Sequence, residues 1–108
     1  MINHQREAYV KRILNAYLHL PDTPSRTNSL DRKLAEDLFG RNLSPETVEN
    51  AMLLAVARRH ARKNQLPLGP IRSLHYFLPI IQELIASPLP ESYFDYLKRF
   101  VDKLTGSL

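Results

Sequence analysis

The sequence of 108 residues contains no cysteine and no tryptophan. Without cysteine, the chain has no disulfides, no thiolate metal ligands and no cysteine nucleophile, and this composition fits a reducing compartment. No run approaches the eighteen or so apolar residues of a membrane span. The first residues, "MINHQREAYVKRIL", are charged throughout and lack the apolar core of a signal peptide. We therefore expect a cytoplasmic protein that does not cross a membrane.

Glycine is also scarce. The three glycines, at positions 40, 69 and 106, each fall where a helix could end, and no run of alternating β-branched residues is present. Apolar residues recur at helical spacing almost throughout the chain. A chain of this length corresponds to one domain. The sequence therefore predicts an all-α fold, a compact single-domain bundle of about five helices spanning residues 1–108.

The predicted helices follow from the apolar stripes and their interruptions. They cover roughly residues 3–19, 30–39 and 45–63, then run from Pro70 or Ile71 to "SPLP", and from there to Gly106. Pro79 falls inside the fourth helix. Because proline removes one backbone hydrogen bond and clashes with the preceding turn, we expect a kink there or two short helices.

Several helix ends carry recognisable signals. Ser29 is a plausible N-cap with Asp31 in the first turn after it, and Gly40 suits the left-handed position after a helix. Ser44 followed by Pro45 is the clearest helix start in the chain.

Positive charge is concentrated in one segment. The chain has a net charge of +4. Residues 41–64 hold five basic and two acidic groups, whereas residues 1–40 hold six and five and residues 65–108 hold four of each. A local excess of this kind attracts polyanions.

The basic end of the third helix is the candidate nucleic-acid contact. Basic residues four apart form two adjacent rows on a helix, and Arg72 could return to them after a short loop. Such a surface would hold phosphates without reading bases. The other explanation is that cations at a helix C-terminus only complement its dipole and cover apolar surface with their stems. The candidate phosphate contacts are Arg58, Arg59, Arg62, Lys63 and Arg72, with Arg41 as a lesser candidate, and the candidate stacking side chains are Tyr76 and His75.

No arrangement typical of catalysis is present. The four histidines show no zinc-ligand spacing, and the chain has no glycine-rich phosphate loop and no HExxH motif. We therefore expect no enzyme activity, metal, cofactor or small-molecule substrate. A cleft that joins His60, His75 and a carboxylate would reverse this expectation. Sequence reading by the third helix is also unexpected, because its start, "SPETVEN", carries two glutamates and no cation to face phosphate.

Two segments, "LSPETVENAMLLAVA" and "SLHYFLPIIQEL", resemble the C-terminal helical module of DnaD-type replication-initiation and primosomal proteins. The resemblance covers roughly residues 43–85. In that family an acidic-capped helix precedes a helix with Tyr, Ile and Trp at four-residue steps. Tyr76 and Ile80 match this pattern, and Leu84 stands where the tryptophan would be. The resemblance implies DNA binding, a part in loading a replicative helicase, and oligomerisation. Small helical proteins of this kind also look similar to accessory proteins of bacterial mobile elements.

The aromatic residues near the C-terminus suggest a different function. The segment "ESYFDYLKRF" is too rich in aromatic side chains for one narrow stripe. If Tyr93, Leu97 and Phe100 face the core, Phe94 or Tyr96 points away from it and marks an interface with a replication protein or a second copy. The alternative function is thus a protein-interaction or self-association module with no nucleic-acid role.

Overall fold

The structure, a computed structural model, describes residues 4–61 and 68–105. These residues form helices α1 (His4–Leu18), α2 (Ser29–Gly40), α3 (Pro45–His60), α4 (Leu78–Ala86) and α5 (Glu91–Leu104), with a 3₁₀ helix, η1 (Leu74–Phe77), directly before α4. No strand occurs among them. The predicted small all-α bundle is confirmed.

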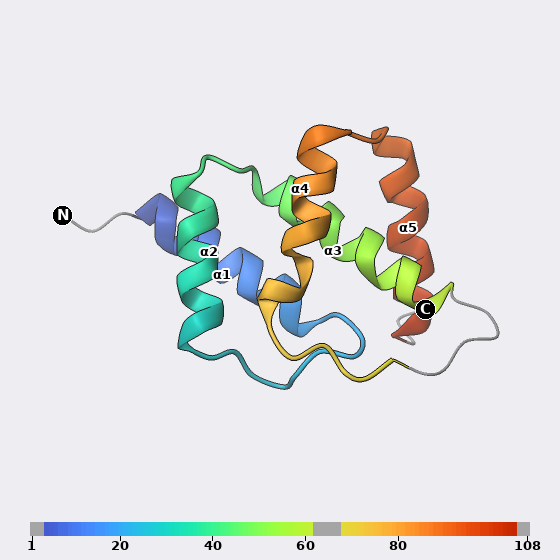
Figure 1. Cartoon of the computed structure of the whole chain (residues 1–108), viewed down its shortest axis with the longest axis horizontal. Coiled ribbons are helices and arrows are strands. Elements are labelled where there is room, and N and C mark those ends of the chain that lie inside the picture. Colours follow the sequence, from blue (N-terminus) through green and yellow to red (C-terminus); the bar gives the residue numbers. More distant parts are fainter. Residues whose placement is uncertain (1–3, 62–67, 106–108) are drawn as a thin grey trace.

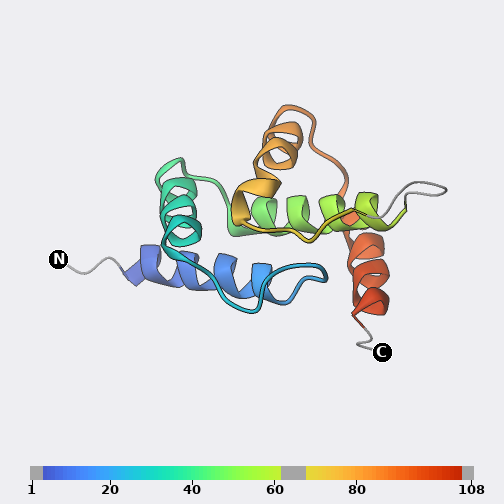
Figure 2. The ribbon, with the colours of Figure 1, turned by 60° about the horizontal axis from the view of Figure 1, so that its bottom comes forward.

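Helix α3 is the central element of the bundle. It contacts α1, η1, α4 and α5, whereas α2 packs on α1 and η1. Figure 2 shows α4 and α5 on different sides of α3. Seven of the sixteen residues of α3 are buried, and three of these are alanines, which allow neighbouring helices to approach closely. The molecule is elongated, about 52 Å in its longest dimension, with α2 and α5 towards opposite ends (Figure 1).

The helix ends follow local rules, with two corrections to the predictions. The hydroxyl of Ser44 accepts a hydrogen bond from the amide of Thr47, as expected of an N-cap. The N-cap of α2 is Asn28 and not Ser29. The left-handed residue after α2 is Asn42, with φ of 61°, and not Gly40, because the helix continues through Gly40. Asparagine tolerates this conformation better than most residues.

Asp31 connects the start of α2 to the start of η1. Its carboxylate accepts hydrogen bonds from the amide of Asn28, at 3.1 Å, and from the amide of Leu74, at 2.9 Å. At 1% exposure it is the most deeply buried charged residue among those the structure describes. The amide of Leu74 donates in a buried position, so one carboxylate satisfies it and joins two segments 43 residues apart.

The region around Pro79 forms two short helices, one of the two outcomes expected from the sequence. Helical structure begins at Leu74 and not at Pro70 or Ile71. Pro79 lies in the first turn of α4, where the missing N–H would have no helical partner anyway.

Two buried tyrosines are expected to make the fold less stable as the pH becomes alkaline. Tyr17 is fully buried, and its hydroxyl has no hydrogen-bond partner within the described residues. Burial, and secondarily the charge of Asp31, raises the pKa of Tyr17 to about 12, and burial raises the pKa of Tyr9 similarly. Because the pKa of Tyr17 in the folded state lies above the ordinary 10.0, its neutral side chain contributes fully to the free energy of unfolding below pH 10. This contribution to stability is lost as the pH rises towards 12.

We expect the Tyr17→Phe variant to be at least as stable as the parent at pH 7, because it removes an unpaired buried hydroxyl. Between pH 9 and pH 12, we also expect the free energy of unfolding of the variant to fall by about 2 kcal/mol less than that of the parent. Urea denaturation followed by circular dichroism at both pH values measures this. The exposed Tyr96→Phe is the control. Equal alkaline losses in the parent and the Tyr17 variant would contradict the assignment.

Candidate nucleic-acid interface

The last turn of α3 meets η1 and the segment leading into it. We call this surface the α3–η1 corner, and its described members are Arg58, Arg59, Arg72, His75 and Tyr76. Arg62 and Lys63, also predicted as phosphate contacts, lie outside the described residues.

Arg59 is a structural residue of this corner. Its side chain is only 8% exposed. The guanidinium donates to the carbonyl of Gly69 at 2.6 Å and to the hydroxyl of Tyr76 at 3.2 Å, and it lies 5.5 Å from the centre of the Tyr76 ring. Arg59 thereby holds the segment before η1 against α3. Both terminal nitrogens of Arg59 donate within the protein, and its Nε has no hydrogen-bond partner but lies 3.5 Å from the carboxylate of Asp22. This geometry gives Arg59 a structural role, and its part as a phosphate contact stays a prediction.

Arg58, the residue before Arg59, is exposed and pairs with one carboxylate. It forms two parallel hydrogen bonds to the carboxylate of Glu83 on α4, at 2.9 and 2.5 Å. These bonds raise the pKa of Arg58 and hold the pKa of Glu83 below its ordinary value. Exposed ion pairs contribute little to stability, so a phosphate can replace Glu83 at small cost.

Asp22 joins the corner from the loop after α1, and the sequence analysis missed it. Its carbonyl accepts a hydrogen bond from Ile71, at 2.8 Å, and its carboxylate lies 2.8 Å from Nε2 of His60 and 3.5 Å from Nε of Arg59. With φ of 68°, Asp22 is one of two left-handed non-glycine residues among those described. Its place directly after a helix-ending proline was the available signal, because aspartate readily adopts this conformation in turns.

The segment Arg72–Tyr76 presents the open side chains of the corner. Arg72 and His75 are exposed, and Arg72 has no ion pair to any described residue. Tyr76 is 38% exposed, and its ring is fixed between Arg59 and the edge of Phe77, whose centre lies 5.2 Å away. The described part of the corner therefore offers one cation without an ion pair and one partly exposed ring on the same short segment.

His60 and His75 do not converge on a carboxylate. His60 contacts Asp22, whereas His75 is exposed on η1. Among residues 4–61 and 68–105, no three histidine or acidic side chains are grouped as metal ligands would be.

Arg41 does not belong to the corner. It is the C-cap of α2 and pairs with Asp37 at 2.9 Å, just before α3 begins. Arg58 and Arg59 lie at the other end of this 16-residue helix, roughly 20 Å away by helix rise alone. The suggested return of Arg41 towards the other cations is wrong.

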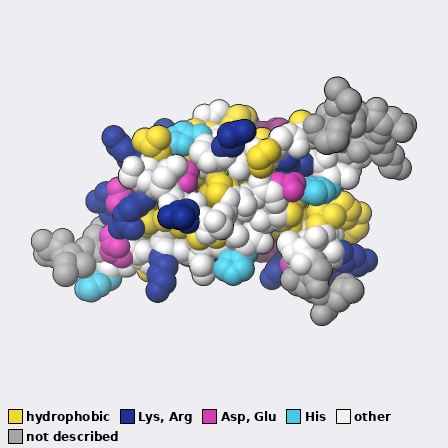
Figure 3. Space-filling view, turned by 90° about the horizontal axis from the view of Figure 1, so that it is seen from below, with side chains coloured by type: hydrophobic (Ala, Val, Ile, Leu, Met, Phe, Trp, Pro, Cys, Tyr) yellow, Lys and Arg dark blue, Asp and Glu magenta, His cyan; other side chains and the backbone are white. Residues whose placement is uncertain are grey.

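The cations of α1 and α2 are largely paired with carboxylates. Arg12 bridges to Glu46 and Glu49, and Arg32 bridges to Glu7 and Glu36. Figure 3 shows Lys and Arg side chains interspersed with Asp and Glu at this end of the molecule, on the left. This end is a mixed surface and not a basic patch.

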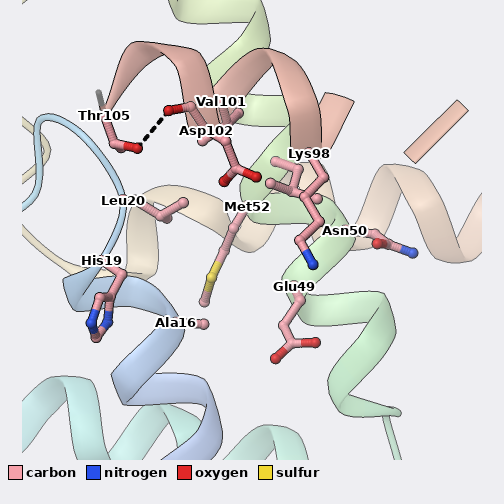
Figure 4. Close-up of a pocket in the computed structure, with 11 residues that line it drawn as sticks. Ala16, His19, Leu20, Glu49, Asn50, Met52, Lys98, Val101, Asp102 and Thr105 are labelled. Carbon is pink, nitrogen blue, oxygen red and sulfur yellow. Dashed lines mark hydrogen bonds between the residues drawn. The ribbon is translucent and has the colours of Figure 1, made fainter. Parts of the chain in front are cut away.

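A hollow of about 510 Å³ lies elsewhere, between the end of α1, α3 and α5 (Figure 4). Apolar side chains such as Leu20 and Met52 line it, and Glu49, Lys98 and Asp102 reach it from the helices around it. None of these charged side chains is buried, and Glu49 is already bound to Arg12. The hollow therefore contains no shielded reactive group.

The aromatic residues of α5 agree with the prediction at Tyr96, which points away from the core, and differ from it at Phe94 and Tyr93. Phe94 is buried at 7% exposure, together with Leu97 and Val101, so its assignment to an interface is wrong. Tyr93, expected in the core, is 41% exposed, and Tyr96 is 55% exposed. The helix is rotated so that Phe94 is buried, whereas Tyr93 lies beside α3 and stays partly exposed.

Comparison with protein-family models, with curated proteins and with solved structures finds no match for this chain. The resemblance to a DnaD-type module therefore stays a prediction. No helix in the described parts of the chain is both long and apolar enough to cross a membrane.

Proposed function

We propose that this protein is a non-enzymatic DNA-binding module and that the α3–η1 corner is its contact surface. Its role would be in DNA replication or in the maintenance of a mobile element, as the DnaD-type resemblance implies. The observation that supports this most is that one short segment carries both an exposed Arg72, which makes no ion pair with any described residue, and the ring of Tyr76, which packs against Arg59 and Phe77.

Each side chain has a separate part in the proposed contact. Arg72 neutralises a phosphate directly, and Arg58 does so by exchanging Glu83 for phosphate. Tyr76 offers a ring on which a base can stack, and Arg59 keeps that ring in place. Arg62 and Lys63 follow Ala61 directly in the sequence and bring the number of candidate phosphate contacts to four.

Binding of this kind is independent of base sequence and sensitive to salt. With four phosphate contacts, the logarithm of affinity for duplex DNA should fall against the logarithm of salt concentration with a slope of about −3.6. Fluorescence anisotropy with a labelled 20-base single strand and the matching duplex, at several salt concentrations, measures the slope for each form.

The Arg72→Ala variant should bind more weakly to every DNA sequence and should reduce the steepness of the salt dependence by about 1. Arg41→Ala is the matched control, since it removes the same charge at the opposite end of α3. Equal losses in the two variants would mean that binding follows net charge and not the corner. A parent protein without affinity for either DNA would refute the proposed function.

A second candidate function is favoured by the exposed tyrosines of α5. It is the protein-interaction module without any nucleic-acid role. If the protein binds no DNA, this candidate function remains, and it requires a partner protein.

A further inference from the structure

The apolar face of α5 is only partly covered by the rest of the protein. Phe94, Leu97 and Val101 are buried, and α3 is the main element that α5 packs against. Tyr93 and Tyr96 continue the same apolar face but are 41% and 55% exposed. Figure 3 shows hydrophobic side chains beside Lys and Arg side chains on the right, the end where α5 lies in Figure 1. Clustered exposed aromatic side chains are typical of interaction surfaces.

A hollow of about 180 Å³ lies between this uncovered half of α5 and α3. We call it the α5 hollow. It exists partly because Ala57 and Ala61 leave space on α3 opposite Tyr96. A cavity of roughly 150 Å³ holds one benzene molecule, so the α5 hollow has room for one aromatic or large aliphatic side chain. Its lining residues are Leu54, Ala57, Arg58, Ala61, Tyr93, Tyr96, Leu97 and Phe100.

The tyrosines at this hollow are held in place before any partner binds. The rings of Tyr93 and Tyr96 stack with centres 6.3 Å apart and planes inclined by 26°, and Tyr93 also contacts the ring of Phe94. Rigid aromatic side chains lose little conformational entropy on binding, which favours affinity.

The rim of the α5 hollow is basic. Arg58 lines it directly. At 100° per residue, Lys103 and Arg99 lie about 20° and 60° around α5 from Tyr96, and both are exposed without an ion pair to any described residue. The carboxylates of α5 (Glu91, Asp95 and Asp102) lie about 100° or more from Tyr96 by the same geometry.

We propose that the α5 hollow is a docking site for an acidic peptide segment of another protein. One aromatic or large aliphatic side chain of the peptide enters between Tyr96 and Ala61. The peptide's carboxylates contact Arg58, Arg99 and Lys103, and the carboxylate that reaches Arg58 replaces Glu83. Charge complementarity of this kind favours encounter and fixes the orientation of the peptide.

Charge and chemistry distinguish this partner from two others. A second copy related by two-fold symmetry would bring the same cations of both rims together, which is unfavourable. A nucleic-acid base is a poorer fit, because most side chains that line the hollow, such as Leu54, Ala57 and Leu97, offer no hydrogen bonds to its polar edge. An apolar side chain flanked by carboxylates fits both the walls and the rim.

The test is selection of a displayed library of random twelve-residue peptides on the full chain. We expect the enriched peptides to share one aromatic or large aliphatic residue flanked by Asp and Glu. A labelled enriched peptide should bind the Tyr96→Ser variant at least tenfold more weakly. The Ala61→Leu variant, which fills the hollow from an exposed position, should weaken binding similarly. Leu30→Ser, which removes an exposed apolar side chain from α2, is the control and should bind like the parent.

Three outcomes would overturn the proposal. The first is that no peptide is enriched, or that the enriched peptides lack acidic residues or bind equally to the Tyr96 and Ala61 variants. The second is a concentration-dependent dimer in sedimentation that either variant abolishes, which would assign the α5 hollow to a second copy. The third is that a single-stranded 20-base DNA binds the parent, competes with the peptide and loses affinity in the Tyr96 variant. Circular dichroism establishes that each variant is folded.

The result is separable from that of the proposed DNA function. Tyr96→Ser and Ala61→Leu leave Arg72 and Tyr76 unchanged, so DNA binding at the α3–η1 corner should persist in both variants. Loss of peptide binding with retained DNA binding is the pattern expected if both proposals hold.

Discussion

Replacing Asp31 by alanine should lower the free energy of unfolding by about 3 kcal/mol. The substitution removes the acceptor for two backbone amides, those of Asn28 and Leu74, of which the latter is buried. Hydrogen bonds to a charged group contribute about 1.5–3 kcal/mol each, and a buried donor without a partner costs about 1–3 kcal/mol. Urea denaturation followed by circular dichroism measures the change.

The isosteric Asp31→Asn variant should show an intermediate loss in the free energy of unfolding. Its side chain has one acceptor oxygen, whereas the two carboxylate oxygens of Asp31 each accept a hydrogen bond from a backbone amide. Asp37→Ala on the same helix is the control. Asp37 is exposed, and among the described residues its side chain pairs with Arg41 alone, so we expect a change of at most about 0.5 kcal/mol. If Asp31→Ala were as stable as this control, Asp31 would not connect α2 to η1 in solution.

Arg59→Ala should lower the free energy of unfolding by about 2–3 kcal/mol, whereas Arg58→Ala should cost less than about 1 kcal/mol. The two residues are adjacent and carry the same charge. A difference in stability between the two variants therefore reflects the different contacts of the two side chains. Arg59 loses hydrogen bonds to Gly69 and Tyr76 and a contact with a ring. The ion pair that Arg58 loses within the described residues is the exposed one with Glu83.

Lysine should not replace Arg59 successfully, because a single ammonium cannot reproduce a planar guanidinium that donates in two directions and lies over a ring. Amide hydrogen exchange at Ile71 provides a local measurement, since that amide donates to Asp22 at the same corner. We expect faster exchange at Ile71 in Arg59→Ala and Arg59→Lys but not in Arg58→Ala. Equal effects of the Arg58 and Arg59 substitutions would contradict the structural role assigned to Arg59.

These contrasts bear on the proposed function. Weaker DNA binding by Arg59→Ala would reflect a displaced Tyr76 and η1 as well as a lost charge, so this variant alone does not identify a phosphate contact. Arg72→Ala is the informative substitution, because Arg72 is exposed and makes no ion pair with the described residues.

The sequence alone was sufficient for the helices and most of their ends. Apolar spacing, Ser44 before Pro45, and Pro79 are local signals, and each acts within a few residues of itself. For the same reason the errors at Ser29 and Gly40 are small. The true cap, Asn28, is the adjacent residue, and the left-handed residue, Asn42, follows two positions later.

The sequence predicted only part of the candidate site. The basic end of α3 and the segment Arg72–Tyr76 were expected to meet, and the structure places Arg59 against Tyr76. The partners that decide the role of each cation were missed. Asp22 and Glu83 lie 37 residues before Arg59 and 25 residues after Arg58, and no local pattern connects such distant positions.

What the sequence determined by itself is a bundle of about five helices with its excess charge at the end of one of them. Helix propensity, capping and apolar periodicity depend on neighbours along the chain, and those neighbours are all in the sequence. Tertiary structure alone decided that Arg59 is internal and Arg58 external, that Phe94 is buried and Tyr96 exposed, and that Asp31 binds the amide of Leu74. In each case the side that becomes buried depends on where α3 and η1 pack, and that position results from the combined burial of apolar side chains from all the helices.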